Sequence, residues 1–267
     1  MDNQISSSLI ITTYNWPEAL ELVLLSVKNQ EKMPSEVIIA DDGSRTETKQ
    51  LIETFQKDFP VPLVHIWHED IGFTKSVILN KAVASAKGEY IIQADGDCIL
   101  HPYFINDHLK YAEKNAYLFG SRVSIQKQYL NSLFNDKQVF FTAFSKGINK
   151  RTRALYSPLL AKLYKKSNVF SSKFRGCNTS YFKSDFIRVN GYDENFTGWG
   201  REDSELALRF HNIGLKARRL RYCGIVFHIF HIEKSKSRLE INNEIQNNTI
   251  KNRLTWCKNG IDKYLND

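Results

Sequence analysis

The sequence predicts an α/β protein whose mostly parallel, twisted sheet is flanked by helices. Three observations support this class. Over the first hundred residues, short apolar or β-branched runs alternate with stretches of helical periodicity. The chain has 267 residues, enough to bury a substantial core without disulfides. Its composition, 42% hydrophobic with 13 Gly and 6 Pro, excludes collagen-like and wholly disordered chains.

Four short strands are expected in the first hundred residues. They cover residues 8–13, 36–40, 62–67 and 89–94. Each is a short run rich in apolar or β-branched residues, which is typical of strands buried inside a sheet. No internal repeat accompanies them, so a repeat architecture is not expected.

Between these strands the apolar residues change to helical spacing. Pro17 stands where a first helical turn tolerates proline, and apolar residues then recur at i, i+3, i+4 and i+7 up to Val27. A second helical stretch around Ile52 follows the second strand, and a third covers residues 74–87 and stops at Gly88. Alternating strands and helices imply right-handed crossovers and therefore a parallel sheet.

Polar clusters follow three of the expected strands. They are Thr12-Thr13-Tyr14, Asp41-Asp42-Gly43-Ser44 and Asp95-Gly96-Asp97. Because ligands bind at the carboxyl ends of strands in such sheets, the clusters are expected to converge on one site. The usual glycine-rich motifs for dinucleotides and triphosphates are absent from the sequence. The two carboxylates of the third cluster suggest a divalent cation that would neutralise a phosphate, although a plain turn after a strand explains most such tripeptides.

Positive charge is concentrated in one stretch, residues 146–175, called the basic segment below. With 37 Lys and Arg against 29 Asp and Glu, the formal net charge is +8. The basic segment contains nine basic residues and no acidic one, interleaved with leucines and tyrosines. This pattern is typical of a segment on an anionic membrane face, and equally of a solvated loop or helix face. Nucleic-acid binding is not expected, because no recognised RNA or DNA module accompanies the patch.

Neither export nor membrane insertion is expected. No apolar run approaches the roughly 20 residues needed to cross a bilayer, and the first residues lack the features of a secretory signal. The four cysteines are scattered without a Cys-x-x-Cys pair, so neither a disulfide framework nor a structural zinc site is expected. A reducing cytoplasm fits this composition, with peripheral contact to the inner face of the plasma membrane if the basic segment binds lipid.

The second half of the chain contains the motif Gly198-Trp199-Gly200-Arg201-Glu202-Asp203. Apolar residues at helical spacing follow it, which places Glu202 and Asp203 at a helix N-terminus, where carboxylates often act as caps. Farther on, His228 and His231 place two imidazoles three residues apart. Taken singly, each feature has an ordinary structural explanation: helix caps, an exposed tryptophan loop, or histidines satisfied by backbone carbonyls.

In this order, the motifs resemble those of family 2 glycosyltransferases of GT-A fold, a Rossmann-like arrangement. The second half is similar to the catalytic module of β-1,4-galactosyltransferases and bacterial chondroitin-polymerase-type enzymes. The resemblance implies a GT-A domain over residues 1–235. Within it, residues 1–100 would bind the nucleotide sugar, and residues 101–235 would bind the acceptor and carry out catalysis. Residues 236–267 would form a C-terminal helical extension.

The resemblance also implies roles for single residues. The nucleotide-sugar donor would contact Thr12, Thr13, Tyr14, Asp42 or its neighbour Asp41, Lys75, and Asp95. The metal, Mn²⁺ or Mg²⁺, would bind Asp97, His231 and His228, and nitrogen ligands favour Mn²⁺ over Ca²⁺. Asp203 would be the general base, and Glu202 would hydrogen-bond the acceptor. The lid and acceptor site would comprise Trp199, Gly198, Gly200 and Asn178.

The expected function is therefore an inverting, metal-dependent glycosyltransferase. It would move a hexose or N-acetylhexosamine from a UDP-sugar to a hydroxyl of a glycan or lipid-linked acceptor, in bacterial surface polysaccharide synthesis. Arg201 and Ser204 depart from the galactosyltransferase pattern, which leaves the donor sugar open.

Two other classes of function explain part of these features. A sugar-nucleotide nucleotidyltransferase would share the α/β layout, but it would carry a glycine-rich phosphate loop where this chain has Thr12-Thr13-Tyr14. A non-catalytic basic protein that binds membrane or nucleic acid would explain the basic segment, but not the paired acids and histidines.

Overall fold

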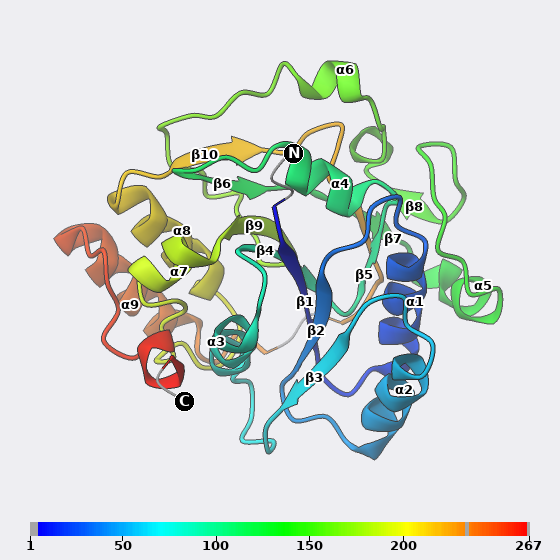
Figure 1. Ribbon diagram of the computed structural model, residues 1–267, viewed down its shortest axis with the longest axis horizontal. Coiled ribbons are helices and arrows are strands. Elements are labelled where there is room, and N and C mark those ends of the chain that lie inside the picture. The colour runs from blue at the N-terminus through cyan, green and yellow to red at the C-terminus, as the bar shows by residue number, and fades with distance from the viewer. Residues whose placement is uncertain (1–4, 233–234, 266–267) are drawn as a thin grey trace.

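The computed structural model describes residues 5–232 and 235–265, and its centre is a seven-stranded sheet with helices on both faces (Figure 1). The strands are β1 (Ser7–Thr13), β2 (Glu36–Asp41), β3 (Leu63–Trp67), β4 (Tyr90–Asp95), β6 (Ala116–Phe119), β9 (Asn178–Phe182) and β10 (Lys216–Arg219). Their order is β10-β6-β9-β4-β1-β2-β3. β9 runs antiparallel to both of its neighbours, whereas the other pairs in this sheet are parallel. The expected mostly parallel α/β sheet is confirmed.

The elements predicted for the first hundred residues are present. β1 to β4 each lie within one residue of the expected limits. The helices between them are α1 (Pro17–Lys28), α2 (Thr46–Gln56) and α3 (Lys75–Ser85). Pro17 is the first residue of α1, as expected for a residue whose missing N–H has no partner in a first helical turn.

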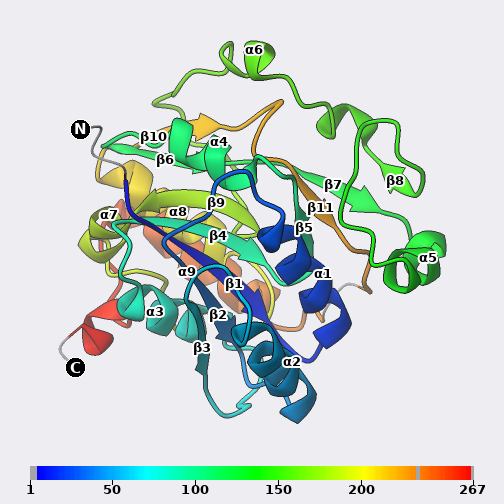
Figure 2. The same ribbon diagram turned by 45° about the vertical axis from the view of Figure 1, so that its right-hand side comes forward.

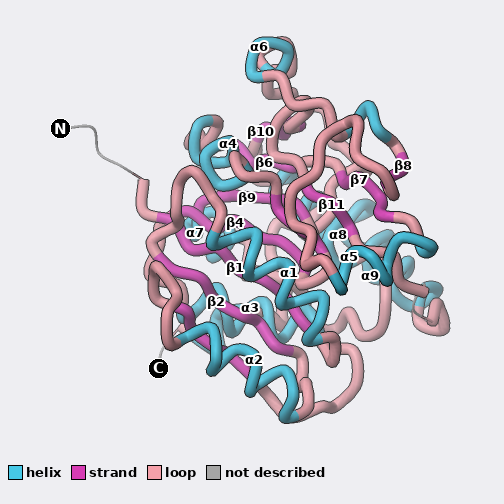
Figure 3. The backbone as a smooth tube through the Cα atoms, turned by 90° about the vertical axis from the view of Figure 1, so that its right-hand side faces the viewer, coloured by secondary structure: helices cyan, strands magenta, loops and turns pink. Residues whose placement is uncertain are grey.

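The two faces of the central sheet pack against different helices. In β1, Leu9 and Ile11 join the core cluster that contains apolar residues of α1 and α2, whereas Ile10 joins the cluster that contains those of α3. This alternation follows from the two-residue period of a strand. In Figure 3, α1 and α2 lie in front of the sheet and α3 lies behind it. Both faces are therefore covered, which leaves the carboxyl ends of the strands as the place for a ligand.

The remaining short helices are α4 (Phe104–Lys110), α5 (Leu130–Asn135), α6 (Pro158–Ala161) and α7 (Lys183–Arg188). α6 lies within the basic segment, the rest of which is loop except for two short elements near its start. Among the described residues, no helix combines the length and apolar character that crossing a membrane requires.

A second, four-stranded sheet brings distant parts of the chain together. Its strands are β5 (Cys98–Leu100), β7 (Arg122–Ile125), β8 (Ile148–Asn149) and β11 (Val226–His228), in the order β5-β11-β7-β8. β5 and β11 are antiparallel, and their register pairs Cys98 with His228. Figure 2 shows β5, β7 and β11 side by side. The register therefore places Asp97, just before β5, next to the end of β11.

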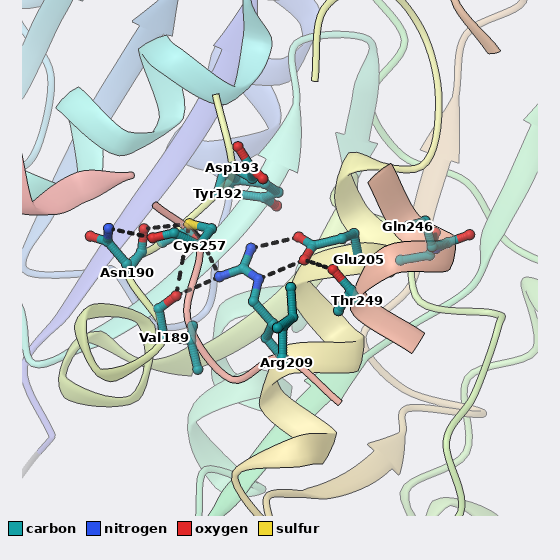
Figure 4. Close-up of polar contacts among 12 residues, drawn as sticks. Val189, Asn190, Tyr192, Asp193, Glu205, Arg209, Gln246, Thr249 and Cys257 are labelled. Atoms are coloured by element: carbon teal, nitrogen blue, oxygen red, sulfur yellow. Dashed lines mark hydrogen bonds and ion pairs between the residues drawn. The ribbon is translucent and has the colours of Figure 1, made fainter. Parts of the chain in front are cut away.

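The C-terminal part of the chain packs on the helix that begins with the acidic pair. This helix is α8 (Glu202–Asn212), and α9 (Leu239–Asn252) lies against it. The fully buried Arg209 pairs with Glu205 at 2.6 Å, and Thr249 of α9 donates to the same carboxylate at 2.9 Å (Figure 4). Arg209 also donates to the backbone carbonyl of Gly191 at 2.7 Å. The predicted division at residue 235 stays a prediction, but the two parts share a buried polar network.

Replacing Arg209 by Ala is expected to destabilise the protein by about 3–5 kcal/mol, because the carboxylate of Glu205 is left buried without its cation. Urea unfolding followed by circular dichroism measures this free energy. The matched control is Arg188→Ala on the exposed side of α7, expected to stay within about 0.5 kcal/mol of the parent. Equal effects of the two substitutions would contradict a structural role for the buried pair.

Candidate active site

A cavity of about 970 Å³ opens at the carboxyl ends of β1, β2 and β4. Most of the residues singled out in the sequence line it: Thr12, Thr13, Tyr14, Asp42, Lys75, Asp95, Asp97, Trp199, Gly200, Glu202, Asp203, His228 and His231. They come from both halves of the chain. The strand-end clusters therefore meet in one cavity, as predicted, and the motifs of the second half line the same cavity.

Asp97, His228 and His231 form a cluster that fits a metal ion. Their ligand atoms all lie within 4.8 Å of one another. His231 Nε2 is 3.2 Å from Asp97 Oδ2, and His228 Nε2 is 3.5 Å from the same oxygen. The other ring nitrogen of His231, Nδ1, lies 2.8 Å from the carbonyl of Ile232, to which it donates when Nε2 serves as a ligand. One carboxylate and two imidazoles suit a transition metal such as Mn²⁺ better than Ca²⁺.

The charge state of this cluster also suits a cation. Burial acts to raise the pKa of Asp97, but the hydrogen bond from His231 and the charge of both imidazoles outweigh it and lower the pKa to about 2. Burial lowers the pKa of His228, which favours the neutral imidazole. An ionised carboxylate beside a neutral imidazole is the protonation state that a metal ion requires.

Asp95 and Lys75 link the donor side of the cavity to the acidic pair. Thr12 Oγ1 donates to Asp95 at 2.8 Å, and Lys75 Nζ pairs with the same carboxylate oxygen at 2.7 Å. Burial acts to lower the pKa of Lys75, but the negative charge of Asp95, followed by that of Asp203 and Glu202, raises it instead. Lys75 is therefore an ammonium ion placed among three carboxylates, and this setting was not evident from its position at the start of a helix.

The two neighbouring aspartates after β2 point to different places. Asp42 lines the cavity and accepts hydrogen bonds from the backbone N–H and the hydroxyl of Thr74, at 3.0 and 2.7 Å. Asp41 is fully buried, and it accepts from the backbone of Ser44 at 2.8 Å and contacts His65 at 2.9 Å. Of the two alternatives left open by the sequence, Asp42 is the one that lines the cavity.

Glu202 and Asp203 start α8 and face the cavity with different surroundings. Glu202 is only 8% exposed, and its Oε2 has no hydrogen-bond partner among the described residues. Burial, and next the charge of Asp203, raise the pKa of Glu202 to about 7 against the opposing effect of Lys75. Asp203 accepts from the hydroxyl of Tyr192 at 3.3 Å. A buried carboxylate with an unpartnered oxygen is suited to a hydrogen bond from a ligand hydroxyl.

The raised pKa of Glu202 predicts a pH-dependent stability. The folded state holds the proton of Glu202 more tightly than the unfolded state does. The stability that this proton contributes is fully present below about pH 4.5, and it is lost as the pH rises through 7 and the buried carboxyl group ionises. Glu202→Gln is therefore expected to stabilise the metal-free protein at pH 8 by about 2–3 kcal/mol and to have little effect at pH 4. Urea unfolding at both pH values measures the difference. The control Glu244→Gln, on the exposed side of α9, should change neither; a pH-independent effect of Glu202→Gln would contradict the shifted pKa.

A buried hydrogen-bond chain holds Asp203, and no sequence pattern predicts it. Tyr192 also receives a hydrogen bond from Gln93 of β4 at 3.1 Å, and Tyr181 of β9 donates to Gln93 at 3.1 Å. A Cβ on Gly176 would lie 2.3 Å from Asp203 Oδ1, so only glycine fits beside the carboxylate there. Tyr192 and Asp203 are eleven residues apart in the sequence, so their contact depends on the fold.

The Trp199 loop lies over the cavity and is anchored by α9. Gly198 and Gly200 have φ values of +71° and +108°, which other residues rarely adopt. Asn242 of α9 donates to the carbonyl of Gly200 at 2.9 Å, while the Trp199 side chain is 41% exposed. The glycines thus allow the turn that presents Trp199 to a ligand, although Gly198 does not itself line the cavity.

Asn178 is placed differently from what the resemblance implied. Its side chain is 1% exposed and does not line the cavity. It donates to the carbonyl of Gly224 at 2.7 Å, and its oxygen lies 3.2 Å from His108 Nε2. Because both ends of the amide bind inside the fold, the geometry does not support an acceptor contact for Asn178.

Comparisons with known proteins match both halves of the chain to glycosyltransferase sequences. The sequence profile of glycosyl transferase family 2 matches residues 8–186, and that described as the N-terminal domain of galactosyltransferase matches residues 158–232. Chondroitin synthase of Escherichia coli is 25% identical over 226 residues, which cover 78% of this chain and 32% of that protein. The chain therefore spans about a third of the length of this relative.

Solved structures show the same fold. S. aureus TarS (residues 1–349), in complex with UDP, gives a TM-score of 0.64 at 15% identity and covers 98% of this chain and 70% of its own. The mannosyltransferase PcManGT from Pyrobaculum calidifontis, in complex with GDP-Man and Mn²⁺, gives 0.61 at 16% identity, covering 94% of this chain and 65% of its own. With a family profile that matches more than half of its residues and a GT-A arrangement of its sheet, the chain belongs to glycosyl transferase family 2.

Proposed function

We propose that this chain is an inverting, metal-dependent glycosyltransferase that moves a hexose or N-acetylhexosamine from a UDP-sugar to an acceptor hydroxyl. One observation carries the proposal. The Asp97, His228 and His231 cluster and the Glu202–Asp203 pair open onto the same cavity. A site for the diphosphate of a donor and a base for an acceptor would thereby lie in one cavity.

The donor side is built from the strand ends. Thr12, Thr13 and Tyr14 would surround the nucleotide, and Asp42 would accept from the uracil N–H. Asp95, held by Thr12 and Lys75, would accept from the ribose. The complex of TarS with UDP and that of PcManGT with GDP-Man support a nucleotide-sugar donor.

Asp97, His228 and His231 would hold the metal, which we propose to be Mn²⁺, with Mg²⁺ as the alternative. When bound, the ion supplies positive charge against the diphosphate, which becomes more negative as the sugar leaves. The Mn²⁺ in the PcManGT complex supports this choice.

Transfer needs a base on the acceptor side. The acceptor oxygen would attack the anomeric carbon, its proton would pass to a carboxylate oxygen of Asp203, and the bond from that carbon to the diphosphate oxygen would break. Tyr192 orients Asp203 by its hydrogen bond, while Glu202 would bind a second hydroxyl of the acceptor. A single displacement from one side inverts the anomeric centre, so an α-linked donor would give a β-glycoside.

The acceptor is proposed to be a glycan or a lipid-linked saccharide. Trp199, with Phe170 and Leu208, gives this part of the cavity an apolar wall on which a sugar ring can stack. Chondroitin synthase of Escherichia coli supports a role in bacterial surface polysaccharide synthesis. A cytoplasmic location stays a prediction.

The test is a panel of UDP-sugars incubated with Mn²⁺, with Mg²⁺ and with a chelator, in which released UDP and the glycoside product are measured. We expect UDP release with at least one hexose or N-acetylhexosamine donor, dependent on the metal, and inverted configuration in the product first seen by NMR. Retained configuration would overturn the single displacement. Full activity in chelator would overturn the role of the metal.

A further inference from the structure

The basic segment is part of a longer stretch without negative charge. Between Asp136 and Asp185 the sequence contains 11 Lys and Arg and no Asp or Glu. A solvated face of a globular protein usually mixes both signs of charge. Most of these cations do not line the cavity, so the catalytic site does not explain why this stretch contains only positive charge.

The middle of the basic segment projects from the molecule as a tied loop. α6 stands at the top of Figure 1, and Figure 3 shows it again as a projection beyond the sheets. The loop is held at both ends: Ser157 N–H donates to the carbonyl of Tyr222 at 2.9 Å, and Ser167 exchanges two backbone hydrogen bonds with Ala217 of β10. The projection is therefore built into the fold.

The tip of this loop exposes large apolar side chains beside lysines. Leu159 is 74% exposed and Leu163 is 72% exposed, whereas Ala161 between them is buried. Lys162 and Lys165 belong to the same stretch, and no carboxylate among the described residues pairs with either of them. A pair of exposed leucines on a rigid projection is typical of an interaction site.

The contact with β10 adds a second group of cations that is close only in the folded chain. Lys216, Arg218, Arg219 and Arg221 follow one another over six residues, beside the two ends of the loop. Arg218 lies 4.0 Å from the ring centre of Tyr111, and Arg221 lies 4.6 Å from that of Tyr222. Lys166 of the loop pairs with Glu113.

We propose that this face, called the docking face and made of Leu159, Lys162, Leu163 and Lys165 with Arg218 and Arg221, binds the surface of an anionic phospholipid membrane. The leucines would enter the boundary between headgroups and acyl chains, and the cations would contact the anionic headgroups. The lysines can extend along the apolar side chains to reach the phosphates. The most exposed apolar side chains of the tip, Leu159 and Leu163, are aliphatic, whereas Tyr164 between the two lysines is half-buried. Single-stranded nucleic acid is bound by exposed aromatic rings that stack on its bases, so the tip favours lipid.

The experiment is flotation of the full chain with vesicles of phosphatidylcholine alone and of phosphatidylcholine with about one-third phosphatidylglycerol. We expect the protein to float with the anionic vesicles only, and less at high salt. Lys162→Glu with Lys165→Glu should weaken binding more than roughly 20-fold, since each cation near such a surface contributes roughly fivefold. Leu159→Ser with Leu163→Ser should weaken it at least severalfold without any change of charge.

The matched control is Lys49→Glu on α2 with Lys57→Glu directly after it, and α2 lies at the other end of the molecule in Figure 1. It changes the net charge as much as the docking-face pair, and it should bind the anionic vesicles nearly as well as the parent. All variants should keep their turnover of a soluble acceptor, so loss of docking is distinguishable from failure of the proposed function.

Three outcomes would overturn the proposal. The first is absence of flotation with the anionic vesicles. The second is equal weakening by the α2 control, which would make the attraction a matter of net charge. The third is unchanged binding of the leucine variant together with loss in the lysine variant, which would show that the leucines do not enter the membrane and that charge alone attracts the protein to it.

Discussion

Replacing Asp203 by Asn is expected to lower turnover by about 10²–10⁴, the range typical of the loss of a general base. Asn cannot take up the acceptor proton, but it keeps the size of the side chain and can still contact Tyr192. Binding of UDP and metal should stay nearly unchanged, because Asp203 is not part of the Asp97, His228 and His231 cluster. Steady-state kinetics measure turnover, and calorimetry measures binding.

The matched control for this substitution is Asp262→Asn, at an exposed position that does not line the cavity. It should leave turnover unchanged. Unchanged turnover in Asp203→Asn would remove this residue from the mechanism and leave Glu202 as the candidate base. Loss of UDP binding in parallel with turnover would indicate that Asp203 holds the donor instead.

Replacing Asp97 by Ala is expected to abolish the dependence of UDP binding on Mn²⁺. Asp97 is the common partner of both imidazoles and the one carboxylate in the cluster. Without it, two neutral nitrogen ligands face an ion that binds oxygen strongly, and we expect Mn²⁺ to bind at least about 100-fold more weakly. Calorimetric titration of UDP with and without Mn²⁺ measures the change. The same Mn²⁺ dependence as in the parent would reject the site.

His231→Ala provides the second arm of this test. It should weaken Mn²⁺ binding while leaving the metal-free unfolding free energy close to that of the parent, since the ring is about one-third exposed. His211→Ala on α8, whose ring does not line the cavity, is the matched control. A large loss of metal-free stability in His231→Ala alone would show that the ring supports the fold rather than a metal.

Residues near strand ends could be predicted well, because their positions follow from local pattern. β1, β2 and β4 are apolar runs, and the polar residues after them must lie at one edge of a parallel sheet. The same reasoning could not separate Asp41 from Asp42, since adjacent side chains after a strand differ only in which way they point. Asn178 shows the opposite limit: the resemblance implied a contact with the acceptor, yet Asn178 starts β9, which lies between two strands, and its side chain is buried.

The character of the acidic pair also lay beyond the sequence. Glu202 and Asp203 are neighbours with the same charge, and the sequence suggested a helix cap for both. Their difference comes from burial: one carboxylate is enclosed beside Lys75, while the other accepts from Tyr192. Burial depends on what packs from distant parts of the chain, which no local spacing contains.

Periodicity and strand-end polarity were sufficient to identify the α/β class and the edge of the sheet where the polar clusters meet, because these depend on neighbours along the chain. Pairing between distant segments was needed for the rest. The register of β5 with β11 brings Asp97 beside His228, and the contact of the basic segment with β10 forms the docking face. Such contacts are selected by the free energy of packing the whole core, so they exist only once the chain has folded.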